Sequence, residues 1–145
     1  MFLGEYRLSL NDDRSLVIPK PFNELFPDGA YITRGFEQNL LIMSTRTFEA
    51  IYARVSGSNI ADPVARLLRR LMLGNACKLE ADQAGNVPVP QALLSFASLE
   101  KEIVLVGQGD YFEIWAPDLW KEQEVIVNDA ETNAQRFAAL DLKTR

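Results

Sequence analysis

Apolar and polar residues alternate along much of the chain, as they do in β-strands. In residues 5–10, "EYRLSL", the apolar side chains fall on one side and Arg7 and Ser9 on the other, the period of two expected of a half-buried strand. "LVI", "AYITR" and "NLLIM" are further short apolar runs. They are separated by "NDDRS" at 11–15 and "GFEQ" at 35–38, whose Asn, Asp and Gly residues favour turns. The pattern predicts four short strands, with at most a helical turn in "KPFNELF".

The same layout occurs a second time along the chain. Superimposing Pro19 on Pro90 aligns "LNDDRSLVIPKPF" with "ADQAGNVPVPQAL", and after a one-residue shift "GFEQNLLIM" lies on "GQGDYFEIW". Strand, polar turn, strand, proline and hairpin follow in one order in both places. Internal similarity of this kind indicates a duplicated structural unit. We therefore predict two repeats, at 5–47 and 76–119.

The segment between the repeats, 48–75, has the pattern of a helical linker. Asp62 is a candidate N-cap, Pro63 suits the first helical position, and Gly74 follows the predicted end. The tail at 120–145 is polar and weakly periodic, and we expect one loosely held helix and a disordered end. The predicted apolar stripe of the linker consists of Val64, Leu67, Leu68, Leu71 and Met72.

The charge of the chain is unevenly distributed. Residues 1–75 carry nine Lys or Arg and eight Asp or Glu, whereas 76–145 carry six and twelve, which together give the net charge of −5. An anionic partner is therefore better matched by the first half, although a uniformly acidic, soluble surface explains the same numbers. Arg66, Arg69 and Arg70 form the densest positive cluster. They either face solvent or carboxylates of a neighbouring subunit, or they contact phosphate.

Composition argues against an enzyme. The chain has no histidine, which removes the commonest general base and the commonest zinc ligand, and its single cysteine, Cys77, lies between apolar neighbours as a core residue would. One cysteine also excludes an intramolecular disulfide. We expect no metal and no cofactor. No apolar run approaches the roughly 18 residues of a membrane span, and the start lacks a signal-peptide pattern, so a cytoplasmic protein is expected.

Several stretches resemble the MraZ family. "MFLGEY", "LVIP" after a polar turn, "TRGF", "LMLGNA" and "KEIVLVGQGDYFEIW" follow in the family's order from Met1 to about Trp120. The resemblance implies a mostly β, α+β fold, in which two tandem SpoVT-AbrB-type swapped-hairpin repeats form one double-split β-barrel with flanking helices. It also implies a regulator of the bacterial division and cell-wall gene cluster. The resemblance further implies a nucleoid-associated, ring-shaped homo-oligomer that binds short G-rich direct repeats in double-stranded promoter DNA, with no membrane partner and no small-molecule substrate.

The family's turn motif, D-x-x-x-R, is altered in both repeats. Its Asp falls on Asn11 and Asp82, and its Arg on Ser15 and Asn86, while Arg14 stands one place early, where the family usually has Gly. A bidentate Arg–guanine contact provides about 1–3 kcal/mol of discrimination. The turns therefore either bind DNA with a changed preference, or the protein is an oligomeric protein-interaction or structural module with weakened or lost DNA binding.

Side chains in and beside these turns are the candidate DNA contacts. Asn and Asp would also be favoured here for backbone reasons alone. Arg7 and Lys20 are expected to position the protein on phosphates. For DNA to be read by both repeats, the two turns must emerge side by side. The complete set is Arg7, Asn11, Arg14, Ser15, Lys20, Asp82 and Asn86.

Overall fold

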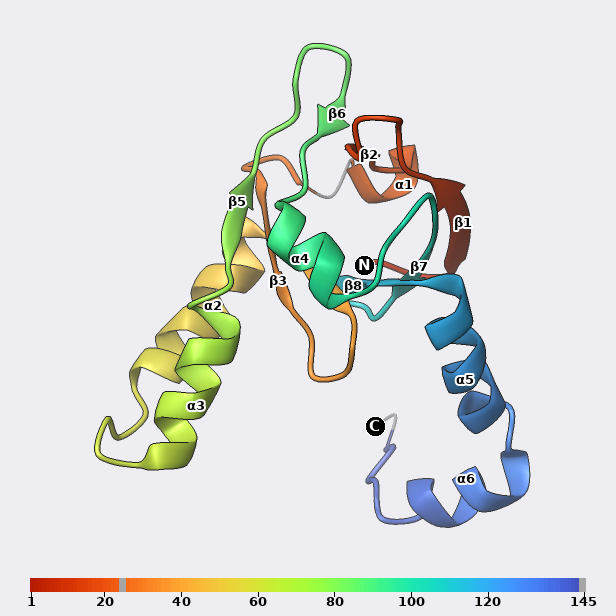
Figure 1. Ribbon diagram of the computed structural model, residues 1–145. Helices are drawn as coiled ribbons and strands as arrows, with labels where there is room; N and C mark the ends of the chain where they lie inside the picture. Colours follow the sequence, from red (N-terminus) through yellow and green to blue (C-terminus); the bar gives the residue numbers. More distant parts are fainter. Residues whose placement is uncertain (24–25, 144–145) are drawn as a thin grey trace.

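The computed structural model describes residues 1–23 and 26–143, and it has an α+β fold. Antiparallel strands form one six-stranded sheet in the order β1-β7-β8-β4-β3-β5 (Figure 1). Two short strands form a separate pair. The sheet consists of β1 (Glu5–Ser9), β3 (Ala30–Arg34), β4 (Leu40–Ser44), β5 (Cys77–Leu79), β7 (Glu102–Gly107) and β8 (Tyr111–Trp115), and the pair of β2 (Leu16–Val17) and β6 (Asn86–Val87).

Helices account for more of the described residues than strands do. The α+β class is confirmed, but strands are not the larger share of the described residues as expected, because three of them are only two or three residues long. The predicted helical turn after Pro19 is α1, and Glu24 and Leu25 of that stretch lie outside the described residues. The helices are α1 (Lys20–Asn23), α2 (Thr45–Ser56), α3 (Pro63–Met72), α4 (Gln91–Phe96), α5 (Pro117–Val127) and α6 (Ala130–Phe137).

Strands from the two halves of the chain interlock. Each of β1, β2, β3 and β4 pairs with a strand from the second half, namely β7, β6, β5 and β8. The main sheet is symmetric in its strand order. Exchanging β1 with β5, β3 with β7 and β4 with β8 gives the same order read from the opposite edge. Within the described residues its end strands, β1 and β5, do not pair with each other, so this sheet is open. The repeat boundaries at 5–47 and 76–119 stay a prediction.

One core is shared by both halves. Phe2, Phe22 and Phe112 pack with ring centroids 4.8–5.3 Å apart, and all three are buried. Leu16 and Val87, which are register partners in β2 and β6, are buried in the same cluster. Full burial of one such side chain contributes about 1.5–3 kcal/mol. Neither half buries its apolar face without the other.

Close backbone packing holds the N-terminus against the sheet. A Cβ on Gly107 would lie 2.5 Å from the carbonyl oxygen of Phe2, so a side chain at this position requires the backbone to move. The Phe2 backbone is bridged to Gly109, with N–H···O bonds of 2.8 Å in both directions. Gly107 is therefore needed where the chain start crosses β7.

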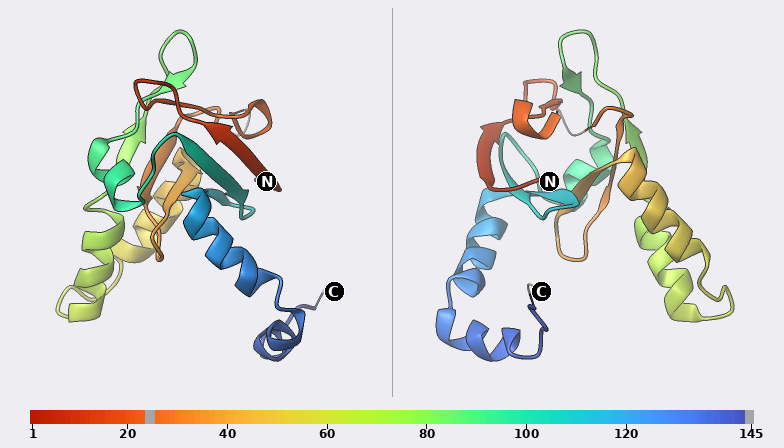
Figure 2. Two further views of the ribbon diagram at one scale, coloured as in Figure 1. Left: turned by 45° about the vertical axis from the view of Figure 1, so that its right-hand side comes forward. Right: turned by 180° about the vertical axis from the view of Figure 1, so that it is seen from behind.

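Two helical arms leave the sheet on opposite sides. Figures 1 and 2 show the hairpin of α2 and α3 on one side, and α5 followed by α6 on the other. The predicted N-cap of α3 is confirmed, because the Asp62 carboxylate accepts the Val64 N–H at 2.9 Å and Pro63 opens the helix. Among the described residues, no helix has the length and apolar character needed to span a membrane.

Three local expectations were wrong. The tail has two helices rather than one, since Asn133 donates to the Ile126 carbonyl at 2.7 Å and ties α6 to the end of α5. Cys77 is partly buried at the edge of the core rather than inside it. Only Met72 of the α3 stripe is buried. Val64 and Leu67 are 71% and 61% exposed, because no other part of the chain that the structure describes packs over them. Of the end of the chain that was predicted to be disordered, residues 144–145 lie outside the described residues.

Candidate nucleic-acid interface

The two polar turns lie side by side. Pairing of β2 with β6 places Val17 opposite Asn86, and the Asn11 side-chain amide donates to the side-chain oxygen of Asn86 at 2.9 Å. In Figure 1 both turns lie at the upper end of the molecule, away from α3 and α6. Segments separated by about half the chain thus form one continuous polar surface.

Both turns are closed by the same backbone hydrogen bonds. In the first, the Asn11 N–H donates to the Ser15 carbonyl at 3.0 Å, and the Arg14 N–H to the Asn11 carbonyl at 2.8 Å. In the second, the Asp82 N–H donates to the Asn86 carbonyl at 2.9 Å, and the Gly85 N–H to the Asp82 carbonyl at 3.0 Å. The two loops therefore present equivalent positions.

The fourth position of each turn requires a left-handed backbone. Gly85 has φ +85°, a conformation that glycine adopts freely, and Arg14 has φ +64°. An L-residue in this region costs about 1–2 kcal/mol. Arg14 is thus held at a position whose geometry favours glycine.

Ser15 is the internal brace of the first turn. Its hydroxyl donates to the Asp13 carboxylate at 2.7 Å and accepts from the Asn11 amide at 2.8 Å, and its own N–H also donates to Asp13. The side chain is 4% exposed. The Ser15 hydroxyl and then the Ser15 N–H lower the pKa of Asp13, because both bonds favour the carboxylate.

In the second turn, the Asp82 carboxylate is the group that holds the loop together, as the Ser15 hydroxyl does in the first. One carboxylate oxygen accepts the N–H groups of Ala84 and Asn86, each at 2.9 Å, and the other accepts the Asn86 side-chain amide at 3.3 Å. The Asn86 N–H is the main cause that lowers the pKa of Asp82, while the charge of Asp13 acts in the opposite direction. The two turns therefore face each other with like charges.

Known proteins resemble this chain over nearly its full length. A family model described as "MraZ protein, putative antitoxin-like" matches residues 72–142. A "Transcriptional regulator MraZ" from Thermomicrobium roseum is 35% identical over 141 residues, 97% of this chain and 99% of that protein. Proteins of the same name from Herpetosiphon aurantiacus, 36% identical over 83% of this chain and 85% of theirs, and Leuconostoc mesenteroides, 35% identical over 98% and 100%, are also similar. The chain belongs to the MraZ family.

The two turns depart from the motif that the resemblance to the family implies. Where the family motif has Arg, this chain has the buried Ser15 and the partly buried Asn86. Arg14 is the cation of the first turn, and its guanidinium reaches the Leu99 carbonyl at 3.5 Å. The two turns also carry exposed carboxylates at Asp12, Asp13 and Asp82. The paired turns are thus more acidic than a phosphate-binding surface normally is.

The remaining candidate contacts lie apart from the turn tips. Arg7 is exposed on β1, but its guanidinium forms ion pairs with Glu5 at 3.2 Å and with Glu124 of α5 at 3.3 Å. Lys20 is exposed at the start of α1, just after β2. The structure therefore brings together Asn11, Arg14, Ser15, Asp82 and Asn86, and leaves Arg7 and Lys20 as flanking cations.

Lys101 is a cation that the sequence did not indicate. It lines a recess with Asn11, Asp12 and Arg14, and its carbonyl accepts the Leu10 N–H at 2.7 Å. A lone lysine between two glutamates carries no local signal, because its position depends on the pairing of β1 with β7. Lys101 adds a positive charge beside the first turn.

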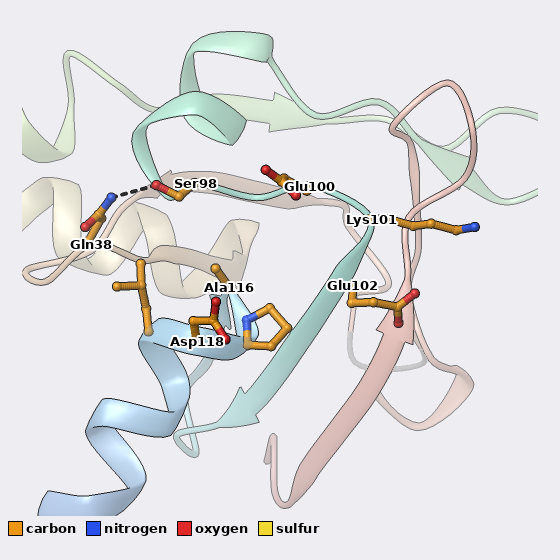
Figure 3. Close-up of a pocket in the computed structure, with 9 residues that line it drawn as sticks. Gln38, Ser98, Glu100, Lys101, Glu102, Ala116 and Asp118 are labelled. Atoms are coloured by element: carbon orange, nitrogen blue, oxygen red, sulfur yellow. Dashed lines mark hydrogen bonds between the residues drawn. The ribbon is translucent and has the colours of Figure 1, made fainter.

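A second recess is unsuited to nucleic acid. It lies between the start of α5 and the segment that leads into β7, where Gln38 donates to the Ser98 hydroxyl at 2.8 Å (Figure 3). Its lining includes the carboxylates of Glu100, Glu102 and Asp118. Figure 3 shows Lys101 pointing away from the other labelled side chains. These three carboxylates would repel phosphates.

Proposed function

We propose that this protein is a DNA-binding transcriptional regulator and that its paired turns are the DNA-reading surface. The observation that supports this most directly is the 2.9 Å bond between Asn11 and Asn86, since it joins equivalent turns of the two halves on one exposed surface. The regulators that it resembles over nearly their full length support the same assignment.

Recognition in this proposal depends on amides more than on guanidinium groups. Asn86 and Asn11 bind base edges or phosphates, because an Asn amide offers a donor and an acceptor that match adenine. In the free protein the Asn11 amide donates to the Asn86 side-chain oxygen, and the Asn86 amide donates to the Asp82 carboxylate, so binding exchanges these bonds for bonds to DNA. Arg14, Lys101, Lys20 and Arg7 supply positive charge around them.

The finer features of the family complete the proposal. The two halves are the swapped-hairpin repeats of a double-split barrel, and the interlocked strand order supports that arrangement. The protein acts in the cytoplasm and at the nucleoid as a ring-shaped homo-oligomer on promoter direct repeats of the division and cell-wall gene cluster. A ring compensates for weak single turns, because several linked contacts gain effective concentration.

A gel-shift measurement tests DNA binding. Duplex DNA from upstream of this protein's own gene is expected to shift at low salt, and less as salt rises, because phosphate contacts release counterions. Arg14→Ala should weaken the shift, because it removes the cation of the first turn. Phe36→Ser, which changes an exposed side chain on the β3–β4 turn outside the polar turns and both helical arms, should leave the shift unchanged. The absence of a salt-sensitive shift at micromolar protein would contradict the proposal.

A protein-interaction module is the second candidate function. The observation in its favour is the acidic character of the turns, where Asp13 opposes the ionisation of Asp82. Such a surface fits a basic protein segment better than DNA. In this case the gel shift is absent, and the oligomer forms without any nucleic acid.

A further inference from the structure

Within residues 1–23 and 26–143, the hairpin of α2 and α3 exposes apolar side chains that the rest of the protein leaves uncovered. Four large apolar side chains are between 52% and 71% exposed there. Val64 and Leu67 are three residues apart on α3, so they share one face of the helix. Large exposed apolar side chains gathered on one helical hairpin are typical of an interaction site. The four residues are Tyr52, Ile60, Val64 and Leu67.

This hairpin is braced rather than loosely attached. Arg69 donates to the carbonyls of Ser56 and Ser58 at 2.7 and 3.2 Å, and Arg66 to those of Ile60 and Ala61 at 3.0 and 3.1 Å. The two arginines therefore hold the link between α2 and α3 in shape. A pre-ordered surface loses less conformational freedom when it binds.

The opposite arm, residues 117–143, exposes a second apolar set. Val125, Ile126 and Val127 at the end of α5 are 48–70% exposed, and Phe137 at the end of α6 is 53% exposed. Leu140 and Leu142 continue the set beyond α6, with 57% and 75% exposed. Asp129 caps α6 through the Thr132 N–H at 3.2 Å, so this surface is also ordered.

The charges on the two arms are complementary. Residues 45–76, which contain the hairpin, carry five arginines and two carboxylates, a net charge of +3. Residues 117–143 carry six carboxylates and three cations, a net charge of −3. Opposite charges around apolar centres favour association of the two surfaces and disfavour association of either with itself.

We infer that the α2–α3 hairpin of one copy binds the 117–143 arm of a second copy. The two surfaces project from opposite sides of the sheet in both Figure 1 and Figure 2, so a second chain is placed to join them. A contact between two different surfaces is head-to-tail, and its repetition gives a closed ring or a filament. The inference rests on the ring of the proposed function and assigns the surfaces that form it.

Mixing two defective variants tests the inference. Val64→Ser with Leu67→Ser damages the hairpin, and Val125→Ser with Phe137→Ser damages the arm. Light scattering after size exclusion should give several chains for the wild type and the mass of one chain, 16.3 kDa, for each variant alone. An equal mixture should give twice that mass, because one intact hairpin and one intact arm remain. Phe36→Ser, which changes a side chain 68% exposed on the β3–β4 turn, is the control and should keep the wild-type mass.

Circular dichroism establishes that each variant is folded. If a serine variant is not, Arg70→Glu on the hairpin and Glu131→Arg on the arm replace the pair, and each should weaken association. Raising salt from about 0.1 M to 1 M shortens the Debye length from about 10 Å to 3 Å and should also lower the mass of the wild type.

Three results would overturn the inference. In the first, the wild type has the mass of one chain, and both faces are then left to a different partner. In the second, the serine variants keep the wild-type mass. In the third, the mixture of the two variants stays at the mass of one chain. The light-scattering measurements are made without DNA, and the gel shift does not report the number of chains in the assembly. A protein that assembles without binding DNA, or binds DNA without this interface, is therefore recognised as such.

Discussion

The side-chain amide of Asn11 donates to the side-chain oxygen of Asn86 at 2.9 Å. These residues occupy opposite ends of the turn motif, the first position in one repeat and the last in the other. The bond fixes the spacing between two equivalent turns, and with it the spacing of any groups that they present to DNA. The polar groups of this surface therefore bind each other in the free protein.

Removing this bond should cost stability. Asn11→Ala eliminates the donor to Asn86 and to the Ser15 hydroxyl, and we expect unfolding to become easier by about 1 kcal/mol, the typical net value of an intramolecular hydrogen bond. Urea denaturation of Asn11→Ala, Asn86→Ala and the double variant isolates the coupling. Gln83→Ala, at an exposed neighbour, is the control. Strictly additive losses would show that the two turns are independent.

Glycine at position 14 should stabilise the protein and weaken DNA binding. Arg14→Gly relieves the left-handed backbone, a gain of about 1 kcal/mol, and removes the cation of the first turn. Gly85→Ala should have the opposite effect on stability, because its φ is +85° while no atom lies within 4 Å of the added Cβ. Thermal melting and the gel shift measure the two effects. A loss of stability in Arg14→Gly would show that the arginine side chain stabilises the fold by more than the left-handed backbone at this position destabilises it.

Acid should loosen the turns. The pKa values of Asp13 and Asp82 are lowered in the folded protein by bonds from Ser15 and Asn86. The unfolded chain then binds more protons than the folded one, so this stabilisation is complete above about pH 4, the ordinary Asp value, and is lost as pH falls through the lower folded values. Denaturation at pH 5 and at pH 3 should show that Asp13→Asn loses less unfolding free energy between the two pH values than the wild type does. Equal losses of unfolding free energy would mean that the hydrogen bonds from Ser15 do not stabilise the Asp13 carboxylate in solution.

Restoring an arginine in the second turn should strengthen DNA binding. Asn86 is partly exposed, whereas Ser15 is 4% exposed, so Asn86→Arg is the substitution that the fold tolerates better. One new Arg–guanine contact is worth about 1–3 kcal/mol, or roughly tenfold or more in affinity for G-rich repeats.

A charge control accompanies this variant. Gln83→Arg adds the same charge to the same exposed turn, outside the motif position. If both variants bind equally, the gain comes from charge alone and position 86 does not read bases. The slope of affinity against salt should steepen in Gln83→Arg if the new group meets a phosphate.

Sequence alone determined the local elements and the family. The alternation in 5–10, the polar turns and the Asp62–Pro63 helix start depend on neighbours within a few residues, and those interactions are the same in almost any context. The family motifs followed from the order and spacing of short stretches. They indicated which positions to compare, and that the arginine positions of both turns had changed.

Only the tertiary structure decided what those positions do. Asn11 meets Asn86 because β2 pairs with β6, and Arg7 meets Glu124 because α5 returns past β1. Lys101, just before β7, reaches the first turn because β7 pairs with β1. Val64 and Leu67 have the periodicity of a core stripe but remain exposed, since periodicity specifies a shared face and not what covers it. Contacts between distant segments depend on strand pairing across the whole chain, which local patterns do not encode.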